Sequence, residues 1–236
     1  MRRAGQVVRE VLELVRGQVK PGVTTFDLEK AAETRLKELD VKAAFKGYHG
    51  FPCVLCTSVN SEVVHGIPSP KRVLHEGDIV SVDFGVIVDG YYGDAAITVP
   101  VGQVDAERTR LLKVTEASLK AGIAAVKPGA TLGDVGAAVQ GVVESEGFSV
   151  VRDFVGHGIG AQMHEDPQVP NYGQAGKGMK LRPGMVIAIE PMVNAGKPDV
   201  LVLDDGWTAV AKDGSMSAHF EHTVAVTDTG ARILTE

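Results

Sequence analysis

The chain opens with apolar residues at helical spacing. Within residues 1–19, five apolar side chains fall on one helical face: Val7, Val8, Val11, Leu12 and Val15. This spacing predicts an amphipathic helix. No capping residue precedes the face, so we expect a helix already in progress and a short preceding segment that is missing from the chain.

Three further helices are predicted from their end signals. Their ranges are 24–39, 105–126 and 131–146. The first and last of these open with Thr-x-x-Asp, a variant of the capping box in which both side chains satisfy free backbone N–H groups. The shared start predicts that the two helices begin in the same way.

Alternation of apolar and polar residues predicts strands after residue 78. Residues 79–98 alternate as two strands on either side of Asp89-Gly90, a strong signal for a two-residue hairpin turn. With that turn, Asp83 lies opposite Ala96, and Asp94 is its diagonal neighbour on the same face. Diagonal neighbours lie roughly 7–8 Å apart, which is a span that two metal-bridging carboxylates could fill.

Two more acids end apolar patterns in the second half of the chain. Val186, Ala188 and Glu190 share one strand face, and Glu221 opens a strand over residues 221–226. Acids are depleted in strands, so their place at the ends of apolar runs is unusual. We expect all four acids to lie on sheet rather than on loops.

The second half of the chain repeats the first. Residues 19–28 recur as residues 126–135, and the stretch from Leu74 to Asp83 recurs from Leu181 to Glu190, both with a shift of 107. Two matches in one register indicate a duplication. We predict an α/β (α+β) protein with an antiparallel sheet core and helices outside. It would form one catalytic domain, residues 1–236, built from two pseudo-twofold-related repeats of about 1–100 and 101–236.

Five side chains form a candidate metal site: Asp83, Asp94, His157, Glu190 and Glu221. Four carboxylates in one place repel one another strongly unless they are protonated or paired with positive charge. Their convergence would therefore imply two divalent cations. Oxygen ligands with one imidazole suit Mn²⁺, Fe²⁺, Co²⁺, Ni²⁺ or Zn²⁺ rather than a thiolate site.

Seven short motifs run in order along nearly the whole chain. They are VHGIP at 64–68, VD at 82–83, GD at 93–94, GHGIG at 156–160, HEDP at 164–167, IEPM at 189–192 and EHT at 221–223. In these motifs the chain resembles type I methionine aminopeptidases, whose duplicated pita-bread fold agrees with the repeat. The resemblance implies that the five candidate ligands bind two divalent cations, and that His65 and His164 contact the substrate.

The resemblance also implies a pocket for a methionine side chain. Its expected lining is apolar and sulfur-bearing, which suits a flexible thioether: Phe45, Tyr48, Phe51, Cys56, Met163 and Trp207. Phe45 and Met163 depart from the family pattern, in which these positions often carry a small or a different aromatic residue. Family members can also hold a monovalent cation, at positions that match Asn60, Glu62 and Ser217.

Each residue type suggests a step in peptide hydrolysis. We expect Glu190 to act as general base, His164 to stabilise the oxyanion, and His65 to hold or protonate the scissile nitrogen. The implied substrate is the N-terminal methionine of nascent polypeptides, with a small residue in second position. The ribosome is a further expected partner, and we expect a monomer.

Composition narrows the classes of protein. The net charge of −6 and the pI of about 5.7 argue against a DNA-binding surface. The sequence contains no signal peptide and no apolar run of membrane-spanning length. Cys53 and Cys56 form no second pair, so buried free thiols are a better reading than a zinc or redox site. These features favour a cytoplasmic protein. The chain also lacks the long basic or zinc-binding extension of some eukaryotic members of the family it resembles, so we expect a bacterial origin.

Two other functions compete with this interpretation. A proline-specific peptidase of the same fold is one, although such relatives usually carry an additional N-terminal domain for which this chain has no room. The other is a binding module of the same fold that has lost catalysis. The presence of all five candidate ligands and both histidines argues against the second alternative.

Overall fold

The computed structural model describes residues 1–236. Its four α-helices are α1 (Arg2–Arg16), α2 (Thr25–Leu39), α3 (Ala106–Ala125) and α4 (Leu132–Ser145), and a 3₁₀ turn, η1, spans Tyr48–Gly50. The predicted helices are thus all present. The first of them ends at Arg16, before Gly17, rather than at residue 19. None of the helices is both long and apolar enough to cross a membrane.

The strands of the first half are β1 (Lys42–Ala43), β2 (Leu55–Val59), β3 (Glu62–Val64), β4 (Ile79–Val88) and β5 (Tyr91–Pro100). Those of the second half are β6 (Ser149–Val150), β7 (Gly156–Gly158), β8 (Glu165–Val169), β9 (Val186–Ile189), β10 (Met192–Asn194), β11 (Val200–Val202), β12 (Ala209–Ala211), β13 (Ser217–His219), β14 (His222–Thr227) and β15 (Gly230–Ile233). Every pairing between them is antiparallel. This confirms the predicted fold class.

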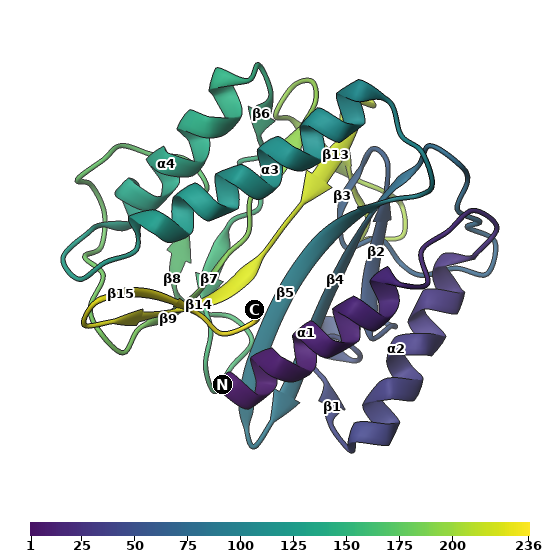
Figure 1. The fold of residues 1–236 in the computed structure, drawn as a ribbon, viewed down its shortest axis with the longest axis horizontal. Helices are drawn as coiled ribbons and strands as arrows, with labels where there is room; N and C mark the ends of the chain where they lie inside the picture. Colours follow the sequence, from purple (N-terminus) through teal and green to yellow (C-terminus); the bar gives the residue numbers. More distant parts are fainter.

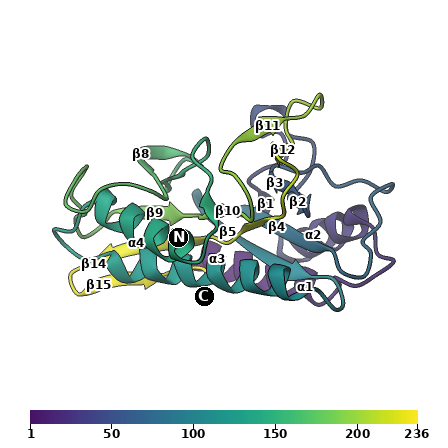
Figure 2. The same ribbon diagram turned by 90° about the horizontal axis from the view of Figure 1, so that it is seen from above.

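The helices and the strands occupy separate layers. Figure 1 shows α1 beside β4 and β5 with α2 next to α1, and α3 and α4 beside the strands of the second half. Figure 2 shows α1 and α3 on one face of the strands and β8, β11 and β12 on the other. The largest core cluster lies under α1 and α2 and contains Leu28, Leu55 and Phe84, all fully buried. The helices therefore leave the opposite face of the sheet free to form a site.

The hairpin between β4 and β5 has the predicted register. Asp83 pairs with Ala96, and Gly85 with Asp94. Asp89 and Gly90 have φ values of 52° and 80°, as a type I′ turn requires. The turn residues therefore fix which face of the sheet receives both aspartates.

Positions related by the shift of 107 make matching contacts. The N–H of Gly22 donates to the carbonyl of Leu74 at 2.8 Å, and that of Gly129 to the carbonyl of Leu181 at 3.0 Å. Thr24 and Thr131 each cap their helix with a complete capping box. The two halves thus use the same device to attach a helix to a neighbouring segment.

Two of the four acids lie beside strands rather than in them. β9 ends at Ile189, one residue before Glu190, and Glu221 lies between β13 and β14. The expectation that all four acids lie on sheet is therefore wrong for these two. The chain turns at Pro191, which has no N–H to continue a ladder.

Candidate active site

One cavity of about 240 Å³ is lined by every residue predicted to bind the divalent metals or the substrate. The five candidate metal ligands lie along its wall together with His65, His164 and the six residues of the expected methionine pocket. His49 also lines it, and the sequence analysis had not singled out that residue. Residues more than 150 positions apart in the chain thus share one chamber.

Three of the candidate ligands form a tight buried group. Ligand atoms of Asp94, His157 and Glu221 all lie within 4.8 Å of one another. Glu190 joins them, with Oε1 at 3.6 Å from Nε2 of His157. Asp83 is the hairpin neighbour of Asp94 and lines the same cavity.

Burial opposes the charge of these carboxyl groups. It raises the pKa of Asp83 to about 7. Burial, followed by repulsion from neighbouring carboxylates, raises the pKa of Asp94, Glu190 and Glu221 well above the usual range. One oxygen each of Asp83, Asp94 and Glu221 is buried without a hydrogen-bond partner. Buried acceptors of this kind fit divalent cations, which would supply both the missing partner and the missing positive charge.

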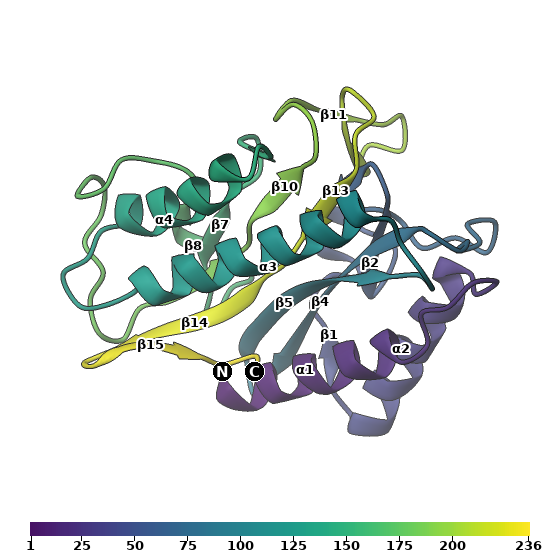
Figure 3. The same cartoon turned by 45° about the horizontal axis from the view of Figure 1, so that its top comes forward.

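The site lies on a seam between the two halves. β13 and β14 run beside β5 through the middle of the molecule, as Figures 1 and 3 show. At the centre of the seam, the N–H of Glu221 donates to the carbonyl of Ala96 at 2.9 Å, and the N–H of Ala96 to the carbonyl of Glu221 at 3.4 Å. This pair places Glu221 beside the hairpin that carries both aspartates.

On each side of that pair, a threonine hydroxyl bridges the strands. Thr223 Oγ1 donates to the carbonyl of Asp94 at 2.7 Å and accepts from its N–H at 3.1 Å. Thr98 Oγ1 does the same for His219, at 2.7 and 2.9 Å. We call these two the seam threonines. Their hydroxyls satisfy the backbone N–H and carbonyl groups of Asp94 and His219, which have no strand partner on this side. Both threonines and both of their partners are buried.

An apolar wall lies next to the acids. Phe45, Phe51, Cys56 and Met163 are buried in one cluster, against which Trp207 packs. Phe51 and Trp207 meet edge to face, with ring centroids 5.2 Å apart. Both cysteines of the chain are free and buried, as predicted. The wall carries no charge, so a charged side chain entering it would lose hydration without gaining a partner.

A glycine lets the wall approach the acids. A Cβ atom at Gly85 would lie 2.8 Å from Cε1 of Phe45 and 3.3 Å from Oδ1 of Asp94. Because Gly85 pairs with Asp94 in the hairpin, a side chain there would separate the aromatic ring from the carboxylate. The glycine of the VDFG segment therefore serves close packing at the site.

The two histidines predicted to contact the substrate have different neighbours. Tyr48 Oη lies 2.8 Å from Nδ1 of His164, a hydrogen bond that leaves Nε2 free. His65 has a left-handed backbone, with φ of 62°, and its ring contacts Phe154 edge to face at 5.5 Å. Burial lowers the pKa of both imidazoles. Both are therefore neutral at pH 7, and each can donate one hydrogen bond.

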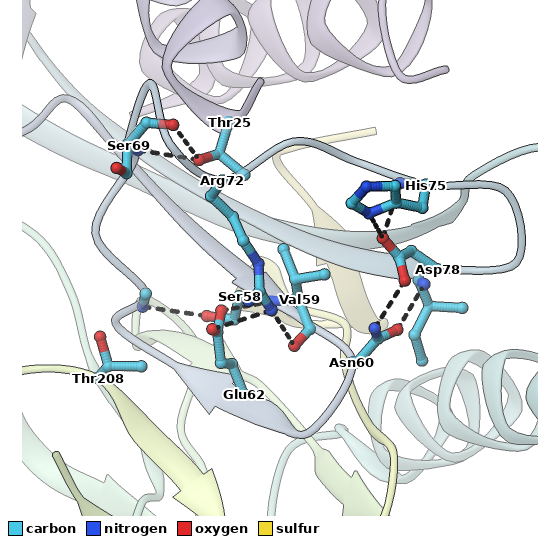
Figure 4. A network of polar contacts seen from close by, with 12 residues as sticks. Thr25, Ser58, Val59, Asn60, Glu62, Ser69, Arg72, His75, Asp78 and Thr208 are labelled. Atoms are coloured by element: carbon cyan, nitrogen blue, oxygen red, sulfur yellow. Dashed lines mark hydrogen bonds and ion pairs between the residues drawn. The ribbon is translucent and has the colours of Figure 1, made fainter. Parts of the chain in front are cut away.

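Two of the three residues expected to hold a monovalent cation, Asn60 and Glu62, lie in the polar network of Figure 4. The amide of Asn60 donates to Asp78 at 2.7 Å, and Glu62 accepts from the N–H of Val59 at 2.7 Å and pairs with Arg72 at 3.2 Å. The carbonyl of Asn60 accepts from the N–H of Ser217 at 2.8 Å. The protein itself thus uses the side chains of Asn60 and Glu62, which leaves the carbonyl of Asn60 and the hydroxyl of Ser217 as oxygens that a cation here could bind.

Sequence reasoning missed His219 beside the acids. This side chain is only 1% exposed, and its Nε2 lies 3.7 Å from Oε2 of Glu190. Burial lowers the pKa of His219 to about 3, so its ring is neutral. One signal was available, because His219 and Glu221 are two positions apart in a strand-like run and so share a face.

Buried carboxylates and an imidazole that share one cavity with an apolar wall define a candidate metal-dependent hydrolase. The chain belongs to Metallopeptidase family M24, whose family model matches residues 1–228. It is 53% identical to the methionine aminopeptidase of Clostridium acetobutylicum, over 100% of this chain and 94% of that protein. The family expected from the motifs is therefore confirmed.

Solved structures agree with this assignment. The methionine aminopeptidase from Thermotoga maritima superposes with a TM-score of 0.99 at 52% identity, covering 100% of this chain and 95% of that one. The prolidase from Pyrococcus horikoshii has a TM-score of 0.78 at 22% identity, and the match covers 60% of its chain. That second likeness shows a shared fold alone.

Proposed function

We propose that this protein removes N-terminal methionine from peptides and nascent proteins in a metal-dependent hydrolysis. The observation that carries the proposal is the single cavity in which a buried carboxylate cluster adjoins an uncharged apolar wall. The full-length identity to proteins named methionine aminopeptidase supports the same activity. The two repeats would act as one catalytic domain, because each contributes carboxylates to the same cavity.

Five residues would hold two divalent ions: Asp83, Asp94, His157, Glu190 and Glu221. When bound, such ions supply Lewis acidity at the peptide carbonyl and lower the pKa of water toward neutrality. The unpartnered oxygens of Asp83, Asp94 and Glu221 support this ligand set. The identity of the divalent ion stays a prediction, with Mn²⁺, Fe²⁺, Co²⁺, Ni²⁺ and Zn²⁺ as candidates. Binding of a monovalent cation at the carbonyl of Asn60 also stays a prediction.

The other residues would act on the substrate directly. Glu190 takes the proton of the attacking water as general base. The free Nε2 of His164 donates to the carbonyl oxygen as negative charge develops there, because Tyr48 occupies Nδ1. His65 holds the scissile nitrogen. The aromatic and sulfur-bearing wall receives the methionine thioether.

The cavity also limits the second residue of the substrate. His65 and Trp207, whose ring centroids are 6.4 Å apart, line the same cavity as the acids and leave little room beside them. We infer a preference for glycine, alanine or serine in that position. Contact with the ribosome, a monomeric state and a cytoplasmic location stay predictions.

A peptide panel tests this function. The metal-loaded protein is assayed on peptides that begin Met-Gly, Leu-Gly, Met-Lys and Ala-Pro, with the Asp94→Asn variant as a matched control for contaminating peptidase. We expect the highest kcat/KM for Met-Gly. An apolar pocket separates methionine from leucine by only about 1–3 kcal/mol, so the expected ratio is roughly 10 to 200. Equal cleavage of Met-Gly and Leu-Gly, or a preference for Ala-Pro, would replace the proposal by a broad or proline-directed peptidase.

A further inference from the structure

The two oxygens of the Glu190 carboxylate have different surroundings. Oε1 faces the acid cluster, 3.6 Å from Nε2 of His157. Oε2 points the other way, 3.7 Å from Nε2 of His219. Glu190 thus lies between two imidazoles, of which only His157 belongs to the proposed metal ligands.

His219 has a nitrogen that nothing else in the protein uses. The side chain is 1% exposed, and its Nε2 is buried without a hydrogen-bond partner. A buried polar atom without a partner costs free energy that an apolar side chain of similar size would avoid. An imidazole at this position therefore indicates a partner for Nε2, and Oε2 of Glu190 is an acceptor at short range.

The backbone on both sides of this contact is fixed. The seam threonine Thr98 bridges the N–H and carbonyl of His219, and Met192 pairs with His219 across the β10–β13 ladder. On the other side, the amide of Asn171 donates to the carbonyl of Glu190 at 3.0 Å. Only the carboxylate of Glu190 is left to be oriented by a side chain.

We propose that His219 is a positioning residue, whose Nε2–H donates to Oε2 of Glu190 and thereby directs Oε1 toward the acid cluster. The proposal rests on the function proposed above, in which Glu190 is the general base. The contact closes from 3.7 Å to hydrogen-bond length by a small rotation of the carboxylate, and catalytic hydrogen bonds often tighten in this way when substrate binds.

Two substitutions of His219 separate the effect of its hydrogen-bond donor from the effect of its side-chain volume. His219→Leu keeps an apolar filling and removes the donor, whereas the amide nitrogen of His219→Gln reaches about as far as Nε2. We expect His219→Leu to lower both kcat on a Met-Gly peptide and the calorimetric affinity for Mn²⁺ by roughly 10–100-fold, the range for partners that orient a metal ligand. KM should stay within about twofold, and His219→Gln should recover most of the loss.

A double-mutant cycle with Glu190→Gln tests the named partner. If His219 acts through Glu190, then His219→Leu should lower the Mn²⁺ affinity much less in the Glu190→Gln background than in the wild type. Equal losses in both backgrounds, or a His219→Gln protein as impaired as His219→Leu, would overturn the proposal. Circular dichroism and thermal unfolding identify a variant that has not folded. In that case it is replaced by Thr98→Val, which removes the hydroxyl that bonds the backbone of His219 and the hydroxyl of Ser81, with the same expected direction.

The two proposals can fail separately. If the wild-type protein loaded with metal does not cleave Met-Gly, the proposed function fails. The Mn²⁺ affinities of the same variants still show whether His219 orients Glu190.

Discussion

The two halves of the molecule bring carboxylates to the same cavity in different ways. The first half uses aspartates inside the long β4–β5 ladder, where Asp83 pairs with a strand on both sides and Asp94 on one. The second half uses glutamates placed just outside the shorter strands β9 and β14. Glu221 is nevertheless held by two backbone hydrogen bonds to Ala96 of β5, whereas Glu190 directly follows the end of β9. The two halves therefore bring carboxylates to the same place on partly different supports.

The largest predicted effect comes from the ladder aspartate at the centre of the cluster. Asp94→Asn should lose both activity and bound metal, with kcat/KM falling by more than roughly 100-fold, because a charged ligand is replaced by a neutral amide. Elemental analysis of the purified variant measures the metal. Full activity in this variant would show that the first half does not carry the central ligand.

Replacing His65, which is proposed to contact the substrate, should lower the catalytic rate without changing metal binding. We expect His65→Ala to lower kcat by roughly 10²–10⁴ if this residue delivers a proton, and to keep the metal content of the wild type. A cleavage assay on a Met-Gly peptide measures kcat, and elemental analysis of the same sample measures the metal content. Loss of metal in this variant would place His65 among the ligands instead.

The seam threonines compare the halves directly. Thr223→Val frees the backbone of Asp94 in the first half, and Thr98→Val frees that of His219 in the second. Each change leaves a buried N–H and a buried carbonyl without partners, and Thr98→Val also removes a partner of the Ser81 hydroxyl. We expect a loss of about 2–4 kcal/mol in urea unfolding for each. Thr223→Ser and Thr98→Ser are the matched controls and should stay close to the wild type. A neutral valine at either site would mean that the seam does not depend on its hydroxyls.

The smallest effect distinguishes the two helix caps. Hydrogen bonds from Thr24 lower the pKa of Asp27, and hydrogen bonds from Thr131 and Gly176 lower that of Asp134. A lowered folded-state pKa contributes stability above the ordinary value of 3.8 that is lost as the pH falls below it. Asp134 also holds the loop at Gly176, so Asp134→Ala should reduce the melting temperature at pH 7 more than Asp27→Ala. Both differences from the wild type should shrink at pH 3, and equal effects would remove this distinction between the repeats.

Local signals predicted the first half better than the second. The Asp89-Gly90 turn fixes the register that places Asp83 opposite Ala96, because a two-residue loop leaves no freedom in pairing. Glu190 and Glu221 were expected on strands, but the apolar runs beside them contain no signal for the residue at which a ladder ends. His219 and the seam threonines depend on pairing between residues 121 and 129 positions apart. No local pattern specifies contacts at such separations, so only the folded structure identifies them.

The central claim is that the seam between the halves builds a site for two divalent ions on which hydrolysis depends. The most direct test is a calorimetric titration of the chelated protein with Mn²⁺, with Met-Gly cleavage followed in the same samples. We predict that the chelated protein is inactive and melts at a lower temperature, because its carboxylates then repel one another, and that activity returns as up to two ions bind per chain. Undiminished cleavage by protein that elemental analysis shows to be free of metal would contradict the account.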